Sequence, residues 1–364
     1  MSFSLNLSKN LEAIGKGATF EVYDIRSTAF TCSTPLIKAH KGETRCQHRL
    51  ILVATATEGL LTGLETYEYV LVPPPDSDEK PQHIIYISKV DTSSSWKIYS
   101  GLTARVVQSY ISSLPKFSRV FVFARAQPQY LFAKSAENKV KTVLNDRQLV
   151  SWWLSVLNKV SVRCQGWWSV PGIDDSNSAL IEVGAKKRGW TPSEKVSWKY
   201  GLSYDQDAVA EQVILRFEDD TKARLLKTTA NDPKMSVKDF WQILSFGEEC
   251  GSGKITGFFE LRLLDETLAT DSNDTGHADF QTADFTAFWN KFMSLDFRSN
   301  EANASSTKLT RQYINDLFPS LQPIKINAKP ANGTNIHAND DTSAAEKRPA
   351  VNMLSGGFIK RKKT

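Results

Sequence analysis

Two segments that alternate apolar and polar residues, 48–54 and 65–72, most constrain how this chain can fold. Such alternation is typical of strands that bury one face. A glycine-containing connection, from Glu58-Gly59 to Gly63, joins them, so they predict a hairpin. A third strand is predicted over 81–87 and ends at Asp91. The first quarter of the chain therefore predicts a β-sheet.

Helical spacing of apolar residues predicts further elements beyond this sheet. Helices are predicted over 102–114, 146–160, 236–246 and 284–297, with Asp146 as the cap of the second. Strands are predicted over 119–123, 209–217 and 255–262. This order agrees with an α/β or α+β protein but does not select one fold.

Composition indicates an ordinary soluble protein. The chain has 364 residues, 41% apolar and 23% charged, enough for a large core in one domain or two fused lobes. It has no run of about 18 uncharged apolar residues, and its N-terminus lacks a signal-peptide pattern. We therefore expect no membrane association and residence in the cytosol or nucleus.

The net charge of +5 belongs to the C-terminus. From Ser320 to Thr364 there are eight Lys/Arg and three Asp/Glu, and 8 − 3 = +5, so the body is near neutral. A neutral body argues against sequence-specific nucleic-acid binding by a folded face. We predict one folded domain over 1–319 and a disordered basic tail over 320–364. Within the tail, 347–348 and 360–363 have the form of a bipartite nuclear import signal, although basic tails often only solvate.

The cysteines indicate a reducing compartment. Four cysteines lie far apart without a CxxC pair, so no disulfide framework is expected. Cys32, His40, Cys46 and His48 match no usual zinc spacing. We predict no bound metal.

Three segments look like nucleotide-binding or cofactor-binding motifs, but each departs from its motif at an essential position. Residues 14–23 look like a kinase glycine loop, but Phe20 replaces the third glycine. Residues 251–256 imitate a P-loop, but Ile255 follows the lysine in place of Ser or Thr. Residues 163–168 begin like the acyl-CoA loop of the commonest acetyltransferase superfamily, but Trp168 prevents close approach to a pyrophosphate. That superfamily is excluded, whereas acetyl transfer is not.

Residues 216–224 carry an unusual density of opposite charges after the apolar run 213–215. Three carboxylates, those of Glu218, Asp219 and Asp220, are followed by Lys222 and Arg224. Two interpretations stay open: a solvated loop after a strand, or a site that orients a substrate lysine and meets an anionic cofactor.

Four segments in a fixed order carry a resemblance to a known family. They are Ile87-Ser88-Lys89-Val90-Asp91-Thr92, Phe123-Ala124-Arg125-Ala126-Gln127-Pro128-Gln129-Tyr130-Leu131-Phe132, Leu149-Val150-Ser151-Trp152-Trp153 and Asp219-Asp220-Thr221-Lys222-Ala223-Arg224. Together they resemble the fungal histone H3 lysine-56 acetyltransferases, the regulator-of-Ty-transposition family. The likeness runs from about Leu50 to Phe246 and is weaker beyond.

The resemblance implies a fold and a reaction. The fold is that of the CREB-binding-protein acetyltransferases, a central, mixed, mostly parallel sheet surrounded by helices. The reaction is transfer of acetyl from acetyl-CoA to histone H3, principally to lysine 56 and also to tail lysines such as 9 and 27. The implied setting is the nucleus, in replication-coupled nucleosome assembly, the response to DNA damage and genome stability.

The resemblance also implies site residues. Asp91, Trp153 and Asp220 match positions linked to activity, and Asp219 belongs to the same acidic pair. Lys222 matches a buried, autoacetylated lysine. From the residues alone, Asp91 could equally cap a turn, Trp153 could be core, and Arg224 could pair with Asp219. The acetyl-CoA wall is implied at Phe123, Arg125, Ala126, Tyr130 and Lys141, with Arg224 near a phosphate.

The implied partners are histones H3-H4 and histone chaperones of the anti-silencing and NAP types. The segment 347–363 is a candidate for chaperone docking, because apolar residues separate its basic clusters. The chain departs from the family at 114–120, where the best-known member carries a long lysine-rich insertion. The alternative is a non-catalytic histone-binding scaffold whose carboxylates attract basic histone tails.

Overall fold

The structure, a computed structural model, describes residues 2–14, 17–94, 99–229, 232, 234–251, 253–264 and 279–329. Its strands are β1 (Thr19–Ser27), β2 (Phe30–Thr31), β3 (Glu43–Thr55), β4 (Gly59–Val72), β5 (Gln82–Thr92), β6 (Arg119–Ala124), β7 (Cys164–Ser169), β8 (Val196–Tyr200), β9 (Gly257–Leu263), β10 (Asp279–Phe280) and β11 (Ile324–Asn327). Its α-helices are α1 (Phe3–Glu12), α2 (Leu102–Ile111), α3 (Asp146–Leu157), α4 (Ser176–Glu182), α5 (Ala210–Val213), α6 (Thr221–Thr228), α7 (Val237–Phe246), α8 (Thr282–Met293) and α9 (Asn300–Leu317).

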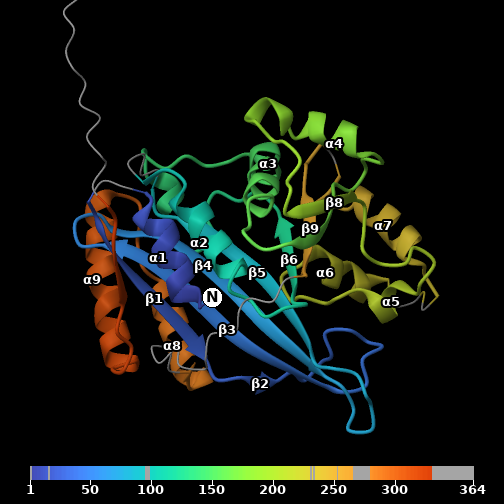
Figure 1. Cartoon of the computed structure of the whole chain (residues 1–364), viewed down its shortest axis with the longest axis horizontal. Helices are drawn as coiled ribbons and strands as arrows, with labels where there is room; N and C mark the ends of the chain where they lie inside the picture. Colours follow the sequence, from blue (N-terminus) through green and yellow to red (C-terminus); the bar gives the residue numbers. More distant parts are fainter. Residues whose placement is uncertain are drawn as a thin grey trace, which may run out of the picture. The chain divides into compact units, whose positions relative to one another are not determined.

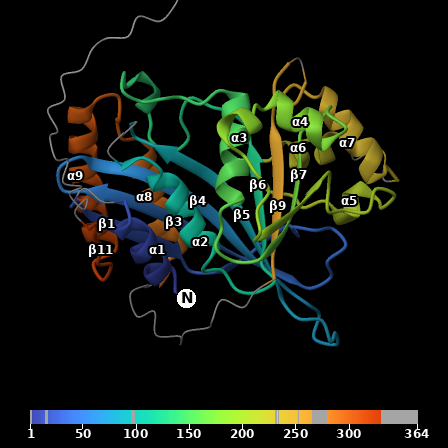
Figure 2. The same ribbon diagram turned by 45° about the horizontal axis from the view of Figure 1, so that its top comes forward.

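All these strands belong to one mixed sheet, in the order β10-β1-β3-β4-β5-β6-β9-β7-β8, with β11 beside β1 and β2 beside β3 (Figures 1 and 2). The predicted class, a central mixed sheet surrounded by helices, is confirmed. The expectation that the sheet is mostly parallel is wrong. Among the described strands only β1/β10, β5/β6 and β7/β8 pair in parallel, and the other seven pairings are antiparallel. Short connections between β3, β4 and β5 require antiparallel neighbours.

Helices α1, α2 and α3 pack on one face of this sheet (Figures 1 and 2). The alternation that predicted β3 explains why both faces are covered. Ile51 and Val53 join the core with α1 and α2, whereas Leu50 and Leu52 point to the other face. There they meet α8, whose aromatic residues, with Phe318 at the end of α9, form a second core. Members of that core include Phe285, Phe288, Phe292, Phe297 and Phe318.

The predicted strand over 209–217 is wrong. The chain forms the short helix α5 and then an extended stretch, and the Ile214 N–H donates to the Ala210 carbonyl at 3.0 Å. The apolar run serves two cores instead of one sheet face, because Ile214 packs with α7 while Leu215 and Phe217 pack beneath β5 and β6. The other predicted elements are present, with ends that differ by a few residues.

The predicted tail begins too early. Residues 324–327 form β11, which pairs antiparallel with β1, and the side chain of Ile326 is buried opposite Phe20. Alternating Ile324 and Ile326 provide enough burial for a short edge strand, which the polar composition of the segment concealed. The part of the predicted tail after residue 329, including 347–363, lies outside the described residues.

Candidate active site

A cavity of about 460 Å³ lies where two parallel strands diverge. Strands β5 and β6 pair only from Ile84–Ile87 and Arg119–Val122. Beyond this point β5 continues beside β4, while β6 leads into the loop 125–145. The carboxyl ends of parallel strands are the usual place for ligands in open α/β sheets, and the volume is that of a small-molecule site.

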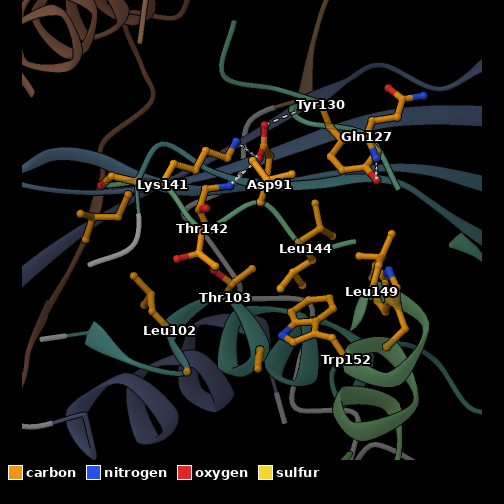
Figure 3. A pocket seen from close by; sticks show the side chains of 18 of the residues that line it. Asp91, Leu102, Thr103, Gln127, Tyr130, Lys141, Thr142, Leu144, Leu149 and Trp152 are labelled. Atoms are coloured by element: carbon orange, nitrogen blue, oxygen red, sulfur yellow. Dashed lines mark hydrogen bonds and ion pairs between the residues drawn. The ribbon is translucent and has the colours of Figure 1, made fainter. Parts of the chain in front are cut away.

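The cavity is bounded by β5, β6, the loop 125–145 and helices α2 and α3. Figure 3 shows Leu102 and Thr103 of α2 and Trp152 of α3 around it, with Asp91 opposite. Apolar and aromatic side chains form most of its lining. They include Leu61, Ile87, Val90, Leu102, Val122, Phe123, Tyr130, Val143, Leu144, Leu149, Trp152 and Trp153.

Asp91 is a buried anchor for the loop that closes the cavity. Its Oδ2 accepts hydrogen bonds from the backbone N–H groups of Tyr130, Leu131 and Phe132 at 2.8, 2.9 and 3.2 Å. Its Oδ1 accepts from the Thr92 N–H at 2.8 Å and from Lys141 Nζ at 2.7 Å. Figure 3 shows Asp91 between Lys141 and Tyr130. With both oxygens occupied, the carboxylate holds the loop and faces the cavity only as part of its wall.

Lys141 is therefore committed within the protein. Its ammonium also donates to Ser135 Oγ at 2.7 Å, and its side chain is only 4% exposed. A phosphate group would have to displace Asp91 to reach it. The placement favours Lys141 as the charge partner of Asp91 over the phosphate contact that the resemblance implied.

Trp153 is both buried and part of the cavity wall. Helix α3 begins with a capping box at Asn145, the residue before the predicted cap Asp146. Trp153 is 5% exposed and belongs to the main core, yet one side of it lines the cavity, as does Trp152 at an edge-to-face angle of 75°. The two interpretations of Trp153 are thus compatible.

Tyr130 and Phe123 line the same cavity. The Tyr130 hydroxyl donates to the Arg125 carbonyl and accepts from the Gln127 N–H at 2.9 Å. Burial raises the pKa of Tyr130 to about 12, so the phenol is neutral at physiological pH. Phe123 stacks on Phe258 with centroids 4.8 Å apart.

Arg125 and Arg224 converge on one carboxylate that sequence reasoning missed. Glu249 lies 3.4 Å from Arg125 and accepts two hydrogen bonds from Arg224, at 2.6 and 2.7 Å. The side chains of both arginines are more than 40% exposed, and neither arginine lines the cavity. Ala126 does not line it either. Arg125 and Arg224 thus both pair with Glu249 outside the cavity. No local pattern marks Glu249, which lies 25 residues from Arg224 in the chain.

The acidic segment divides between a buried pair and an exposed carboxylate. Asp220 caps α6 through the Lys222 N–H at 2.9 Å, and Lys222 Nζ lies 2.8 Å from Asp220 Oδ2. Burial lowers the pKa of Lys222, but the interactions with Asp220, Tyr204 and Glu260 together outweigh burial and leave this pKa above its ordinary value. Asp219 has a side chain 46% exposed, so the two aspartates have different environments.

Asp219 is linked to the cavity through Ser88. The Ser88 hydroxyl donates to Asp219 Oδ2 at 3.0 Å, and Ser88 itself lines the cavity. Ser88 lies in the segment 87–92 that carried the resemblance, but nothing in its sequence context distinguished it. Asp220 and Lys222 do not line this cavity. Lys222 instead lines a small second cavity of about 30 Å³ beside Phe258 and Trp241.

The described residues show neither a metal-binding cluster nor a membrane-spanning helix. No group of three or more His, Cys, Asp or Glu side chains there could hold a metal ion. Within the same residues, no helix combines the length and apolarity that crossing a membrane requires.

The family model of the histone acetyltransferase KAT11-type domain matches residues 103–313, more than half of the chain. The chain belongs to this family of histone lysine acetyltransferases. Membership implies acetyl-CoA as the acetyl donor and histones as acceptors.

Its relatives include fungal proteins named Rtt109. Histone acetyltransferase rtt109 of Schizosaccharomyces pombe is 26% identical over 69% of this chain and 70% of that protein. RTT109 of Candida albicans is 30% identical over 51% of this chain and 50% of its own length. The crystal structure of Rtt109 from Aspergillus fumigatus matches with a TM-score of 0.69 and 22% identity, over 89% of this chain and 99% of that one. The chain is therefore similar to fungal Rtt109 proteins in sequence, and it shares the fold of one of them.

Proposed function

We propose that this protein transfers acetyl from acetyl-CoA to lysines of histone H3, lysine 56 principally and tail lysines such as 9 and 27 in addition. One observation carries the proposal. A single cavity is lined by Asp91, Phe123, Tyr130 and Trp153, from three of the segments that resemble the family, and Ser88 connects it to Asp219 of the fourth.

The residues present fit acetyl-CoA. The aromatic and aliphatic cavity suits the acetyl group and the pantetheine arm, which are mostly apolar. Arg125 and Arg224 suit phosphate oxygens, because guanidinium groups bind them in a bidentate manner. The bound cofactor supplies an activated acetyl thioester. Lys141 contributes by keeping Asp91 neutralised and the closing loop in place.

The acceptor lysine must lose its charge before it attacks. A free lysine has a pKa of about 10.4, so the site must desolvate the amine, accept its proton, or both. Trp153, Trp152 and Tyr130 give the cavity an aromatic wall, which would strip water from the bound amine and favour its neutral form. Asp219, exposed at the Ser88 end, attracts the incoming ammonium. The neutral amine then attacks directly while donor and acceptor are both bound.

We also propose Lys222 as an autoacetylated residue. Its ammonium lies 5.0 Å from the Phe258 ring centroid and 2.8 Å from Asp220 Oδ2, and its side chain is only 8% exposed. Acetylation would remove the charge and leave Asp220 without its cation. Intact-mass spectrometry after incubation with acetyl-CoA tests this, with Lys222→Arg as the variant that loses the modification.

The partners proposed are H3-H4 presented by histone chaperones of the anti-silencing and NAP types, in the nucleus, during replication-coupled nucleosome assembly and the response to DNA damage. The segment 347–363 is the proposed docking segment. Deleting it should weaken chaperone binding and chaperone-stimulated turnover. Unchanged binding and turnover would contradict that assignment.

Calorimetry of acetyl-CoA binding tests the proposed cavity. Ala104→Phe adds a ring to the cavity wall, so this variant should lose acetyl-CoA binding and turnover while it stays folded. Ala283→Phe, at an exposed position of α8, is the matched control and should bind normally. Wild-type protein that binds histones but no acetyl-CoA would favour a scaffold. Normal binding by Ala104→Phe would place the cofactor elsewhere.

A further inference from the structure

We propose that Ser88 relays the proton of the acceptor amine to Asp219. The inference rests on the acetyl transfer proposed above and adds a path for the proton that the reaction releases. Strand β5 carries an irregularity in its pairing with β4. The β4/β5 register passes from Glu65↔Lys89 to Thr66↔Ile87, so Ser88 is an extra residue without a partner in β4. Bulges of this kind redirect side chains and occur next to active sites.

The bulge places the Ser88 hydroxyl at the boundary between the cavity and the acidic segment. Ser88 lines the cavity, and its Oγ lies 3.0 Å from Asp219 Oδ2. Lys89, the next residue, donates from Nζ to Ser88 Oγ at 3.1 Å and to Glu65 Oε2 at 2.5 Å. Glu65 is buried and also bonded to His48 at 2.8 Å, so Lys89 is held on a fixed partner.

These contacts determine the direction of the Ser88 hydroxyl. An ammonium can only donate a hydrogen bond, and an ionised carboxylate can only accept one. Ser88 Oγ therefore accepts from Lys89 and donates its single hydrogen to Asp219. One lone pair of Ser88 Oγ remains, and it is available to an N–H group in the cavity. A hydroxyl polarised between a cation and an anion is thus prepared to accept a proton on one side and release one on the other.

The proposed acetyl transfer releases one proton and one CoA thiolate. The neutral acceptor amine forms a C–N bond to the thioester carbonyl carbon, and its nitrogen becomes positively charged. It passes one proton to Ser88 Oγ while Ser88 passes its own hydrogen to Asp219 Oδ2. The C–S bond breaks and the electron pair leaves with the CoA thiolate. Asp219, with its side chain 46% exposed, then returns the proton to water.

The relay also explains the difference between the two aspartates. Asp220 is fully buried and bonded to Lys222, so it has no route to solvent. Asp219 has both the contact with Ser88 and exposure. The structure thereby assigns proton acceptance to Asp219 through Ser88, and a structural role to Asp220 as the cap of α6.

A double-mutant cycle on turnover tests the relay. General-base contributions are typically 10²–10⁴-fold. Ser88→Ala should lower kcat by about tenfold or more with little change in the KM for acetyl-CoA, and Ser88→Thr, which keeps a hydroxyl, should retain most activity. Asp219→Asn should lower kcat similarly. The double variant should be no slower than the slower single variant, because both changes interrupt one path.

Ser197→Ala, on the exposed face of β8, is the matched control and should behave as the wild type. Thermal unfolding verifies that each variant is folded. Independent, multiplicative losses in the double variant would overturn the relay, and so would a Ser88→Ala enzyme as fast as the control. Absence of histone acetylation by the wild type would overturn the proposed function and the relay with it. An active wild type beside an unimpaired Ser88→Ala overturns the relay alone.

Discussion

Lys141 Nζ lies 2.7 Å from Asp91 Oδ1, and the two side chains are 4% and 5% exposed. The pair joins the end of β5 to Lys141 of the loop 125–145. Asp91 holds a second part of the same loop, because it also accepts hydrogen bonds from the N–H groups of Tyr130, Leu131 and Phe132. The wall of the cavity thus depends on one buried ion pair.

Asp91→Ala should destabilise the protein by roughly 3–5 kcal/mol, because it leaves the Lys141 ammonium buried without a counter-charge. Urea unfolding measures the change. Asp91→Ala combined with Lys141→Met should recover part of the loss, since no unpaired charge remains. A loss below about 1 kcal/mol in the single variant would contradict the anchoring role.

The buried Asp220–Lys222 pair allows the same kind of test. Lys222→Met leaves Asp220 buried without its cation, and we expect a loss of roughly 3–5 kcal/mol. Asp220→Asn with Lys222→Met should lose less than the sum of the single variants, because contacting residues are not additive. The free energy of unfolding in urea reports both. Strict additivity would mean that the 2.8 Å contact contributes little.

Glu249 should compete with the cofactor for Arg125 and Arg224. Because both arginines are exposed, each pair contributes at most about 1 kcal/mol. Glu249→Gln should therefore tighten acetyl-CoA binding a few-fold in calorimetry. Glu248→Gln removes the same charge one residue earlier and should have a smaller effect. Acetyl-pantetheine lacks the phosphates of CoA that the arginines would bind, so it should bind both variants with the wild-type affinity. If Glu249→Gln tightened acetyl-pantetheine binding as much as acetyl-CoA binding, competition at the arginines would be excluded.

The environment of Glu65 should make the free energy of unfolding fall in acid. Burial raises the pKa of Glu65, but hydrogen bonds from His48 and Lys89 outweigh burial, so this pKa is below its ordinary value of 4.5 in the folded protein. Its stabilising contribution is present above pH about 4.5 and is lost as the pH falls through the folded value. Glu65→Gln should flatten the decline of the unfolding free energy between about pH 5 and 3. Glu79→Gln, an exposed control, should leave the decline as in the wild type.

Local patterns were sufficient for most elements around the cavity. The alternation in 48–54 predicted β3 because its side chains enter two different cores. The same argument failed at 209–217, where the apolar residues divide between two cores without joining the sheet. It also missed β11, since Ile324 and Ile326 stand in a polar segment and gain their burial from β1 and α1, about 300 residues away in the chain.

The candidate site depended more strongly on tertiary contacts. The segments that resemble the family named Asp91, Tyr130 and Trp153, which do line one cavity. Sequence reasoning could not foresee that Lys141 is occupied by Asp91 or that Glu249 joins the two arginines, because these contacts span 50 residues in the first case and 25 or more in the second. A side chain's free or paired state is determined by such long-range neighbours.

Mass spectrometry of H3-H4 incubated with acetyl-CoA, an anti-silencing-type chaperone and this protein tests the central claim most directly. We predict acetylation of H3 lysine 56 by the wild type and a large loss with Asp219→Asn, whose exposed position leaves the fold intact. Lysine 56 that stays unmodified with folded wild-type protein, or equal acetylation by Asp219→Asn, would contradict the account.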